Sequence, residues 1–288
     1  MHSPLDVEQN VGTGTIKVWA GIYDALSALQ AERLGYDALW LSSLGLSTGR
    51  IGLPDGGFLQ PDTVIAAVGE INRVTDIPIN VDFENGYGLR GAELQALAGR
   101  FFAAGSHGLC IEDSAGAKRN SLWANTGRTL ATIDDMAERL TSLVQVARQH
   151  DATIIARTEV LIEGGSVDEA VQRVRAYAAA GCQAVVVHFR ADVEAVLEVA
   201  RKAADVDVDL VVIPTAAPSM TFATFAEAGF DVYVTANVAV RAAMTAVEQG
   251  LESVLRLGHQ KDALAGIATL ADLDTLVRTN MLVPGMSS

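Results

Sequence analysis

The sequence is poor in cysteine, with only Cys110 and Cys182 among its 288 residues. The two cysteines lie in separate apolar runs without metal-site spacing, so the sequence predicts neither a zinc site nor a disulfide framework. The chain also lacks a basic, apolar leader at its start, MHSPLDVEQN, and it has no unbroken apolar stretch of membrane-spanning length. We therefore expect a soluble, cytoplasmic protein.

Basic residues are scarce as well. The chain has 21 Lys and Arg against 35 Asp and Glu, which gives a net charge of −14. This balance argues against nucleic acid and anionic membranes as main partners. It does not exclude a small anionic substrate, because a bound cation can reverse the electric field at one site.

Short apolar runs alternate with longer segments of helical periodicity. The predicted strands are residues 16–20, 38–41, 77–82, 108–113, 153–159, 184–189, 210–215 and 232–236. The predicted helices are residues 24–34, 63–74, 91–105, 133–150, 167–181, 193–204, 219–230 and 238–250, and residues 42–60 form a polar, Gly-rich loop. The strands are apolar throughout, which is typical of a parallel sheet covered on both faces.

Eight strand–helix units in about 250 residues predict an α/β fold, the (β/α)₈ TIM barrel. A doubly wound sheet is the alternative, but no GxGxxG follows the first strand. We expect one domain over residues 1–288, with residues 251–288 as a C-terminal helical extension involved in oligomer packing.

Polar side chains follow most of the predicted strands. Four of them are carboxylates, and an Arg and a His follow later strands: Asp55, Asp82, Glu84, Glu112, Arg157 and His188. A single polar residue after a strand needs no function, because loops are exposed to water. In a barrel, however, all of these residues meet at one rim. In VDFENGYG, Asp82 and Glu84 are two residues apart and are predicted to share a strand face, where their repulsion favours a bound cation. Such hard oxygen ligands suit Mg²⁺ or Mn²⁺.

A long loop follows the fourth predicted strand, from Ser114 to Thr129. Loops of this length are uncommon unless they bind ligands or act as lids. The loop contains Lys118, Asn120 and Ser121, and we interpret it as a lid that closes over an anionic substrate.

Several segments together resemble the phosphoenolpyruvate mutase/isocitrate lyase superfamily, and within it the phosphoenolpyruvate mutase branch. VDFENGYG resembles the family's metal segment D-x-D-x-G-Y-G, and LCIEDSAGAKRNSL resembles the mutase stretch E-D-K-x5-N-S. IIARTE, VVVHFR, VVIPT and VTANVAVRAA also occupy the expected places. The similarity extends from about Trp19 to Gly250, and the combination of segments makes it specific.

The resemblance implies a Mg²⁺-dependent enzyme that interconverts phosphoenolpyruvate and phosphonopyruvate, making a C–P bond for phosphonate biosynthesis. It implies that Asp82 is the direct metal ligand and that Asp55, Glu84 and Glu112 hold metal-bound water.

The resemblance also implies how a small α-keto acid or enolpyruvate substrate is held. Ser42, with the backbone N–H groups of Ser43 and Leu44, would bind the carboxylate and ketone end. The remaining residues would bind the phosphoryl group: Arg157, His188 and Asn120, with Lys118 and Ser121 from the lid. Trp40 is interpreted first as a packing residue and is also counted among the candidate substrate contacts.

Two departures from the family pattern leave the activity open. Glu84 replaces the second metal-segment aspartate, but its longer side chain can still reach a metal-bound water. Ser114 replaces the Lys of E-D-K. A hydrolase or a C–C or C–P lyase acting on phosphonopyruvate, oxaloacetate or a related α-keto or 2-hydroxy acid therefore remains the alternative.

Two further interpretations are disfavoured. The loop has no cysteine of the K-K-C-G-H type, which argues against a Cys-dependent isocitrate or methylisocitrate lyase. A barrel that only senses a small anion would not need all four carboxylates. Because related enzymes exchange a terminal helix, the resemblance also implies a homo-oligomer, a dimer or a tetramer. The last segment, TNMLVPGMSS, is interpreted as a tail or a partner-docking segment.

Overall fold

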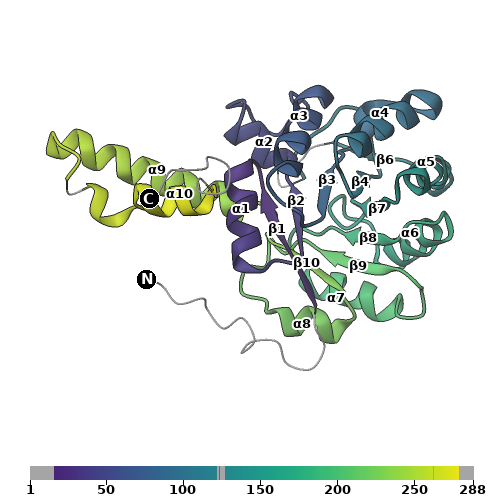
Figure 1. Cartoon of the computed structure of the whole chain (residues 1–288). Helices are drawn as coiled ribbons and strands as arrows, with labels where there is room; N and C mark the ends of the chain where they lie inside the picture. The colour runs from purple at the N-terminus through teal and green to yellow at the C-terminus, as the bar shows by residue number, and fades with distance from the viewer. Residues whose placement is uncertain (1–15, 122, 124–126, 262, 279–288) are drawn as a thin grey trace.

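The computed structural model of the chain is a closed barrel of eight parallel strands surrounded by helices (Figure 1). The structure describes residues 16–121, 123, 127–261 and 263–278, so the N-terminal start and the TNMLVPGMSS segment lie outside the described residues. The barrel strands are β1 (Lys17–Ile22), β2 (Ala38–Leu41), β3 (Ile79–Asp82), β4 (Gly108–Glu112), β7 (Thr153–Thr158), β8 (Ala184–Val187), β9 (Asp209–Val212) and β10 (Val232–Val234). They pair in this order, and β10 pairs back to β1, which confirms the predicted (β/α)₈ barrel.

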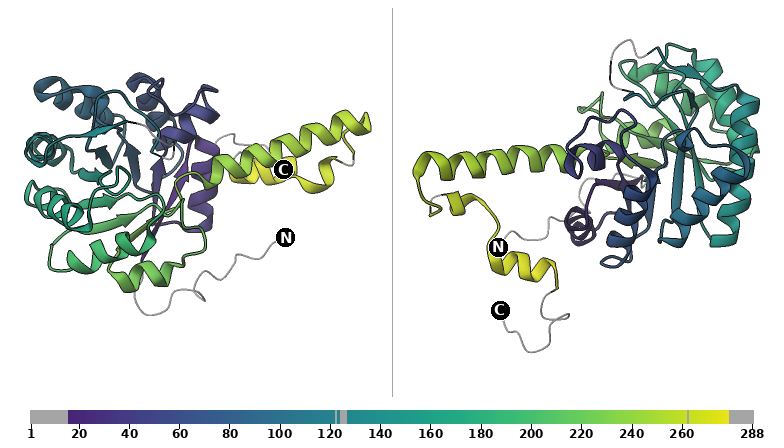
Figure 2. Two further views of the ribbon diagram at one scale, coloured as in Figure 1. Left: turned by 180° about the vertical axis from the view of Figure 1, so that it is seen from behind. Right: turned by 90° about the horizontal axis from the view of Figure 1, so that it is seen from above.

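Helices cover the outside of the barrel between successive strands (Figures 1 and 2). These helices are α1 (Ala25–Leu34), α3 (Pro61–Asn72), α4 (Gly91–Ala103), α5 (Ile133–Ala147), α6 (Val167–Ala179), α7 (Val193–Lys202) and α8 (Phe222–Ala228). Capping side chains fix where five of them begin, by accepting a hydrogen bond from a backbone N–H of the first turn. The caps are Asp24, Thr132, Ser166, Asp192 and Thr221.

The strands are apolar on both faces because each face packs against a different core. Alternate residues point inwards, so Trp40 of β2 packs inside the barrel while Leu39 and Leu41 pack against the helices. Cys110 is also buried inside the barrel, and neither it nor Cys182 forms a disulfide. Packing is therefore confirmed as one role of Trp40, which also stacks on Trp19 with ring centroids 6.3 Å apart.

The loop predicted for residues 42–60 is wrong in its first part, because α2 (Ser43–Gly49) forms there. Glycine and serine are poor helix formers, which hid this helix from the sequence pattern. Ser42 caps α2 by accepting a hydrogen bond from the N–H of Gly45, and Leu46 is fully buried. Tertiary packing thus outweighs weak local propensity.

The long loop after β4 is closed at its base by a two-stranded antiparallel sheet. β5 (Ser114–Ala115) pairs with β6 (Thr129–Leu130), so the first and last residues of the predicted lid are held together. Residues 122 and 124–126 of the predicted lid lie outside the described residues.

A helical arm follows the last strand and projects from the barrel (Figure 2). The arm is α9 (Val238–Leu257), a short 3₁₀ helix (Ala263–Gly266) and α10 (Leu270–Leu276), and α9 spans residue 251, where we expected the extension to begin. No residue of α9 is buried. Among the described residues, no helix is both long and apolar enough to cross a membrane.

A buried polar network ties the end of β4 to β7 and α6. Asp113 accepts hydrogen bonds from the hydroxyl of Tyr177 (2.7 Å), the guanidinium of Arg173 (3.0 Å) and the backbone N–H of Glu159 (2.9 Å). Asp113 is fully buried, so each lost donor leaves part of a desolvated carboxylate without a partner. The network therefore stabilises the rim at which β4 and β7 end.

We expect Tyr177→Phe to lower the free energy of unfolding by about 1–3 kcal/mol, because it removes one donor from buried Asp113. Urea unfolding followed by circular dichroism measures this. Arg201→Gln is the control, since the pair of Arg201 with Glu194 is exposed and should contribute little. Equal stability of Tyr177→Phe and the wild-type protein would contradict a stabilising role of the network.

Candidate active site

The carboxyl ends of the barrel strands surround a cavity. Most of the residues that the sequence singled out line it: Trp40, Ser42, Ser43, Leu44, Asp55, Asp82, Lys118, Asn120, Ser121, Arg157 and His188. Glu84 and Glu112 do not line the cavity but are buried beside it, where each interacts electrostatically with Lys118. The fold thus brings together residues that lie up to 148 positions apart in the chain, from Trp40 to His188.

Asp82 and Glu84 do not share a strand face as predicted. β3 ends at Asp82, and Glu84 has a left-handed backbone with φ of 53° in the turn that follows. The turn folds back so that Asp82 Oδ1 accepts a hydrogen bond from the N–H of Glu84 (3.3 Å). The two carboxylates remain neighbours, but a turn and not strand alternation holds them together.

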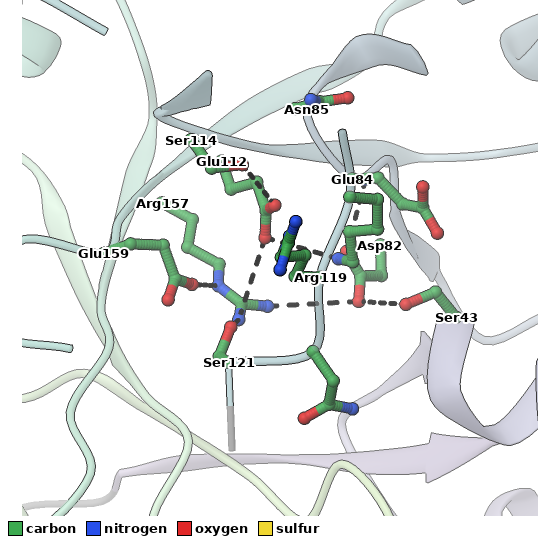
Figure 3. Close-up of polar contacts among 12 residues, drawn as sticks. Ser43, Asp82, Glu84, Asn85, Glu112, Ser114, Arg119, Ser121, Arg157 and Glu159 are labelled. Atoms are coloured by element: carbon green, nitrogen blue, oxygen red, sulfur yellow. Dashed lines mark hydrogen bonds and ion pairs between the residues drawn. The ribbon is translucent and has the colours of Figure 1, made fainter. Parts of the chain in front are cut away.

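Two buried cations, Lys118 and Arg157, lie between the carboxylates, and Figure 3 shows the contacts of Arg157 with Asp82 and Glu112. Lys118 Nζ lies 3.3 Å from Glu112 Oε2, and the guanidinium of Arg157 lies 3.9 Å from both Asp82 and Glu112. Ser43 Oγ donates a hydrogen bond to Asp82 Oδ2 (2.8 Å). Like-charge repulsion in the cluster is therefore offset by two cations from separate parts of the chain.

The carboxylates differ in how they respond to this environment. Burial raises the pKa of Glu84 to about 8, and the charge of Asp82 adds to the rise although Lys118 opposes it. Burial also raises the pKa of Asp55. At Asp82 the same effect of burial is outweighed by Lys118 and Arg157 and by the hydrogen bond from Ser43, so its pKa lies below the usual value. Asp82 is thus ionised at neutral pH, and Glu84 is the carboxyl that most readily keeps a proton.

The carboxylate cluster, which consists of Asp55, Asp82, Glu84 and Glu112, provides oxygen ligands, although it does not form a complete metal-binding site. Within the described ranges, no three His, Cys, Asp or Glu side chains are arranged to hold a metal ion directly. Asp55 Oδ1 and Glu84 Oε1 are nevertheless buried without any hydrogen-bond partner. Buried oxygens in this state are costly, so they fit a site in which one carboxylate binds a hard cation directly and others bind its water molecules.

A second group of polar residues lines the cavity around Arg157. Its Nη2 donates a hydrogen bond to Ser121 Oγ (3.0 Å) and lies 2.8 Å from His188 Nδ1. Burial and the adjacent Arg157 hold the pKa of His188 below its usual value, so the imidazole is neutral at neutral pH. Arg157 keeps its charge, because the surrounding carboxylates raise its pKa despite burial. This wall presents a fixed cation, a hydroxyl and a neutral imidazole to the cavity.

The lid residues are packed into the site. Asn120 Nδ2 donates a hydrogen bond to Asp55 Oδ2 (2.9 Å), and Arg190 of the β8 exit donates to the backbone oxygens of Ser121 and Trp123 (2.7 Å each). The predicted closure of this loop over the site stays a prediction, but these contacts put Asn120 and Ser121 within the cavity wall.

Two buried charged residues behind this wall were not predicted as site residues, although Glu159 ends a predicted strand. Glu159 accepts hydrogen bonds from Arg157 Nε and from Arg128 Nη2, and its Oε1 lies 2.9 Å from His188 Nδ1. Arg128 also donates to Ser121 Oγ (3.2 Å). The spacing of Arg157 and Glu159 in IIARTE could have indicated the first pair. No local signal marks Arg128, because its partners come from other segments.

Two further cavity residues, Thr215 and Asn237, follow β9 and β10. Asn237 Nδ2 donates to Thr215 Oγ1 (3.2 Å). With Trp40, Ile213 and Ala236 they form a less charged wall. On the side of α2, the backbone N–H groups of Ser43 and Leu44 belong to its first turn, where such groups lack helical partners.

Comparison with known proteins gives consistent similarities. A family model described as phosphoenolpyruvate phosphomutase matches residues 12–255. The phosphoenolpyruvate phosphomutase of Streptomyces hygroscopicus is 31% identical over 228 residues, which cover 79% of this chain and 72% of the relative. The crystal structure of a phosphoenolpyruvate phosphomutase from Streptomyces platensis subsp. rosaceus is 31% identical, with a TM-score of 0.88 over 94% of this chain and 93% of that one. A phosphonopyruvate hydrolase in complex with oxalate and Mg²⁺ is 25% identical, with a TM-score of 0.84 over 93% of this chain and 92% of the other.

Proposed function

Because this chain belongs to the phosphoenolpyruvate phosphomutase family, an enzyme family of the phosphoenolpyruvate mutase/isocitrate lyase superfamily, we propose that it is a Mg²⁺-dependent enzyme that interconverts phosphoenolpyruvate and phosphonopyruvate. The observation that supports this most directly is the lining of the cavity. Asp55 and Asp82 of the carboxylate cluster line the same space as the donor residues Arg157, His188, Asn120 and Ser121. Both ends of a small phosphorylated keto acid thus meet suitable partners.

The carboxylate cluster is the proposed metal site. Asp82 is the direct ligand because it lines the cavity and is ionised, and Asp55, Glu84 and Glu112 act through water. The unpartnered oxygens of Asp55 and Glu84 support this assignment, as does the Mg²⁺ in the related hydrolase. Mg²⁺, or Mn²⁺ in its place, supplies charge that stabilises the enolate oxygen of a pyruvate fragment. The substrate carboxylate binds Ser42 and the N–H groups of Ser43 and Leu44.

The remaining residues position the phosphoryl group. In the forward reaction its bond to the enol oxygen breaks and a bond to the methylene carbon forms, with no net change in protons. Phosphoryl transfer needs alignment and charge neutralisation more than a strong nucleophile. Arg157 supplies a planar set of donors to the phosphoryl oxygens, while Asn120 and Ser121 orient them and the lid excludes water.

Hydrolysis of phosphonopyruvate is the second candidate, and one local contact favours it. Position 114 carries a serine, whose Oγ donates a hydrogen bond to Glu112 Oε1 (2.5 Å), so no ammonium group comes from this position. The only lysine beside Glu112 in the described loop is Lys118. Similarity to a phosphonopyruvate hydrolase adds support for this reaction.

We expect phosphonopyruvate incubated with the protein and Mg²⁺ to give the ³¹P NMR signal of phosphoenolpyruvate, because the walled cavity keeps the phosphoryl group away from water. Inorganic phosphate as the main product would identify the hydrolase instead. A spectrum that does not change would contradict both candidates and indicate a substrate without phosphorus.

Asp82→Ala should abolish turnover together with the rise in melting temperature on adding Mg²⁺, a stabilisation of about 2.7 kcal/mol at 100 times the dissociation constant. Asn120→Ala is the matched comparison, since Asn120 is assigned to the substrate. It should lower turnover by about 100-fold or more while keeping the Mg²⁺ effect. Thermal melts with and without Mg²⁺, together with the NMR assay, distinguish the effect of Asp82→Ala from that of Asn120→Ala. Retention of both properties by Asp82→Ala would remove this residue from the metal site.

The helical arm supports a homo-oligomer, a dimer or a tetramer. Many of the exposed large apolar side chains lie on it: Val238, Met244, Val247, Leu251, Leu255, Leu264, Ile267, Leu270 and Leu273. Several of these residues, with Tyr23 and Leu44 of the barrel side, line an apolar groove between α9 and α2. An apolar surface of this kind is typical of a protein interface.

In light scattering we expect a mass that is a multiple of 30.3 kDa. Met244→Glu combined with Leu251→Glu should shift it towards the single-chain mass, because charges are then placed on the apolar face. Arg256→Glu, a charge change on the same helix outside the groove, is the control. A wild-type protein with the mass of one chain would refute the oligomer.

A further inference from the structure

Lys118 is a buried lysine in the middle of the carboxylate cluster. Its side chain is only 6% exposed, and its Nζ lies 3.3 Å from Glu112 Oε2. Among the charges of the described residues, Lys118 is the one that most strongly lowers the pKa of Asp55, Asp82 and Glu84. In turn, the four carboxylates raise the pKa of Lys118 despite its burial. One ammonium group therefore interacts with every carboxylate assigned to the metal.

The charges around it remain unbalanced. When all four are ionised, the carboxylates carry −4, and the cations within 4.0 Å of them, Lys118, Arg157 and Arg128, contribute +3, which leaves −1. The unpartnered oxygens of Asp55 and Glu84 belong to the same cluster. An ammonium group of the protein thus lies among the carboxylates that are assigned to a divalent ion.

We propose that Lys118 is the resident counter-ion of this cluster and sets its metal affinity, because Mg²⁺ can bind fully only as the ammonium group withdraws from the carboxylates. This inference rests on the proposed function, since it concerns the same site. In the metal-free protein Lys118 then neutralises the carboxylates, in addition to any contact that it makes with the substrate. Lys118 then weakens metal binding, although its removal would leave the substrate side of the site with one cation fewer.

The position of Lys118 links metal entry to the lid. The lid contacts the cluster through Lys118 at Glu112 and through Asn120 at Asp55 (2.9 Å). An ion that engages the carboxylates competes with both contacts. The phosphoryl oxygens of a substrate then accept hydrogen bonds from Lys118 and Asn120. The two side chains thus lose their carboxylate partners to the metal ion and gain the substrate as a partner.

Isothermal titration of the substrate-free protein with MgCl₂ tests this proposal. We expect Lys118→Met to bind Mg²⁺ at least 10-fold more tightly than the wild-type protein, because a like charge is removed from beside the ion. Lys17→Met is the matched control. It makes the same substitution at an exposed lysine that begins β1, at the opposite end of the barrel, and should leave the affinity unchanged.

Lys118→Gln is the second variant, and it must show the same tightening, since it removes the charge but keeps a polar side chain. Circular dichroism checks that both variants are folded. If the wild-type protein binds Mg²⁺ and both variants bind it equally or more weakly, this inference is overturned but the proposed function is not. Absence of Mg²⁺ binding in the wild-type protein and in both variants overturns the proposed function as well.

Discussion

The structure at the carboxyl ends of the barrel strands depends on the neutralisation of buried carboxylates that lie close together. Closure of the sheet forces the ends of β3 and β4 and the α2–α3 loop together, and each brings a carboxylate into a place with little water. Desolvated carboxylates that repel one another destabilise a fold unless cations or protons neutralise them. Here Arg157 from β7 and Lys118 from the lid supply the cations, and the high pKa of Glu84 allows a proton to remain.

This neutralisation also explains why Arg157 lies between the carboxylate cluster and the other polar residues of the site. Arg157 faces the carboxylate cluster on one side and Ser121 and His188 on the other, while Glu159 holds its Nε from behind. The guanidinium is therefore fixed in one orientation by partners from three strand ends. A rigid, buried guanidinium between a cation site and an anion site suits an enzyme that must stabilise charge at both ends of a small substrate.

Several site residues could be placed from the sequence because their position depends only on the barrel pattern. Asp82, Glu112, Arg157 and His188 each lie within one residue of the end of a barrel strand, so their convergence follows from the fold class alone. Glu84 was placed correctly for the wrong reason, since a left-handed turn and not a strand holds it. The length of its loop indicated the lid segment, whereas the roles of Asn120 and Ser121 within it came from the family resemblance.

By itself the sequence determined the barrel, its rim and the acidic character of one wall, because periodicity of two and 3.6 residues is a local property of the chain. Only the tertiary structure decided which charges are paired. Arg128 pairs with Glu159, and Lys118 pairs with Glu112, and both pairs join the loop after β4 to residues at the ends of strands. Such contacts join loops whose backbone has no repeating pattern, so their geometry is decided by burial and charge in the folded protein and cannot be derived from neighbours in the chain.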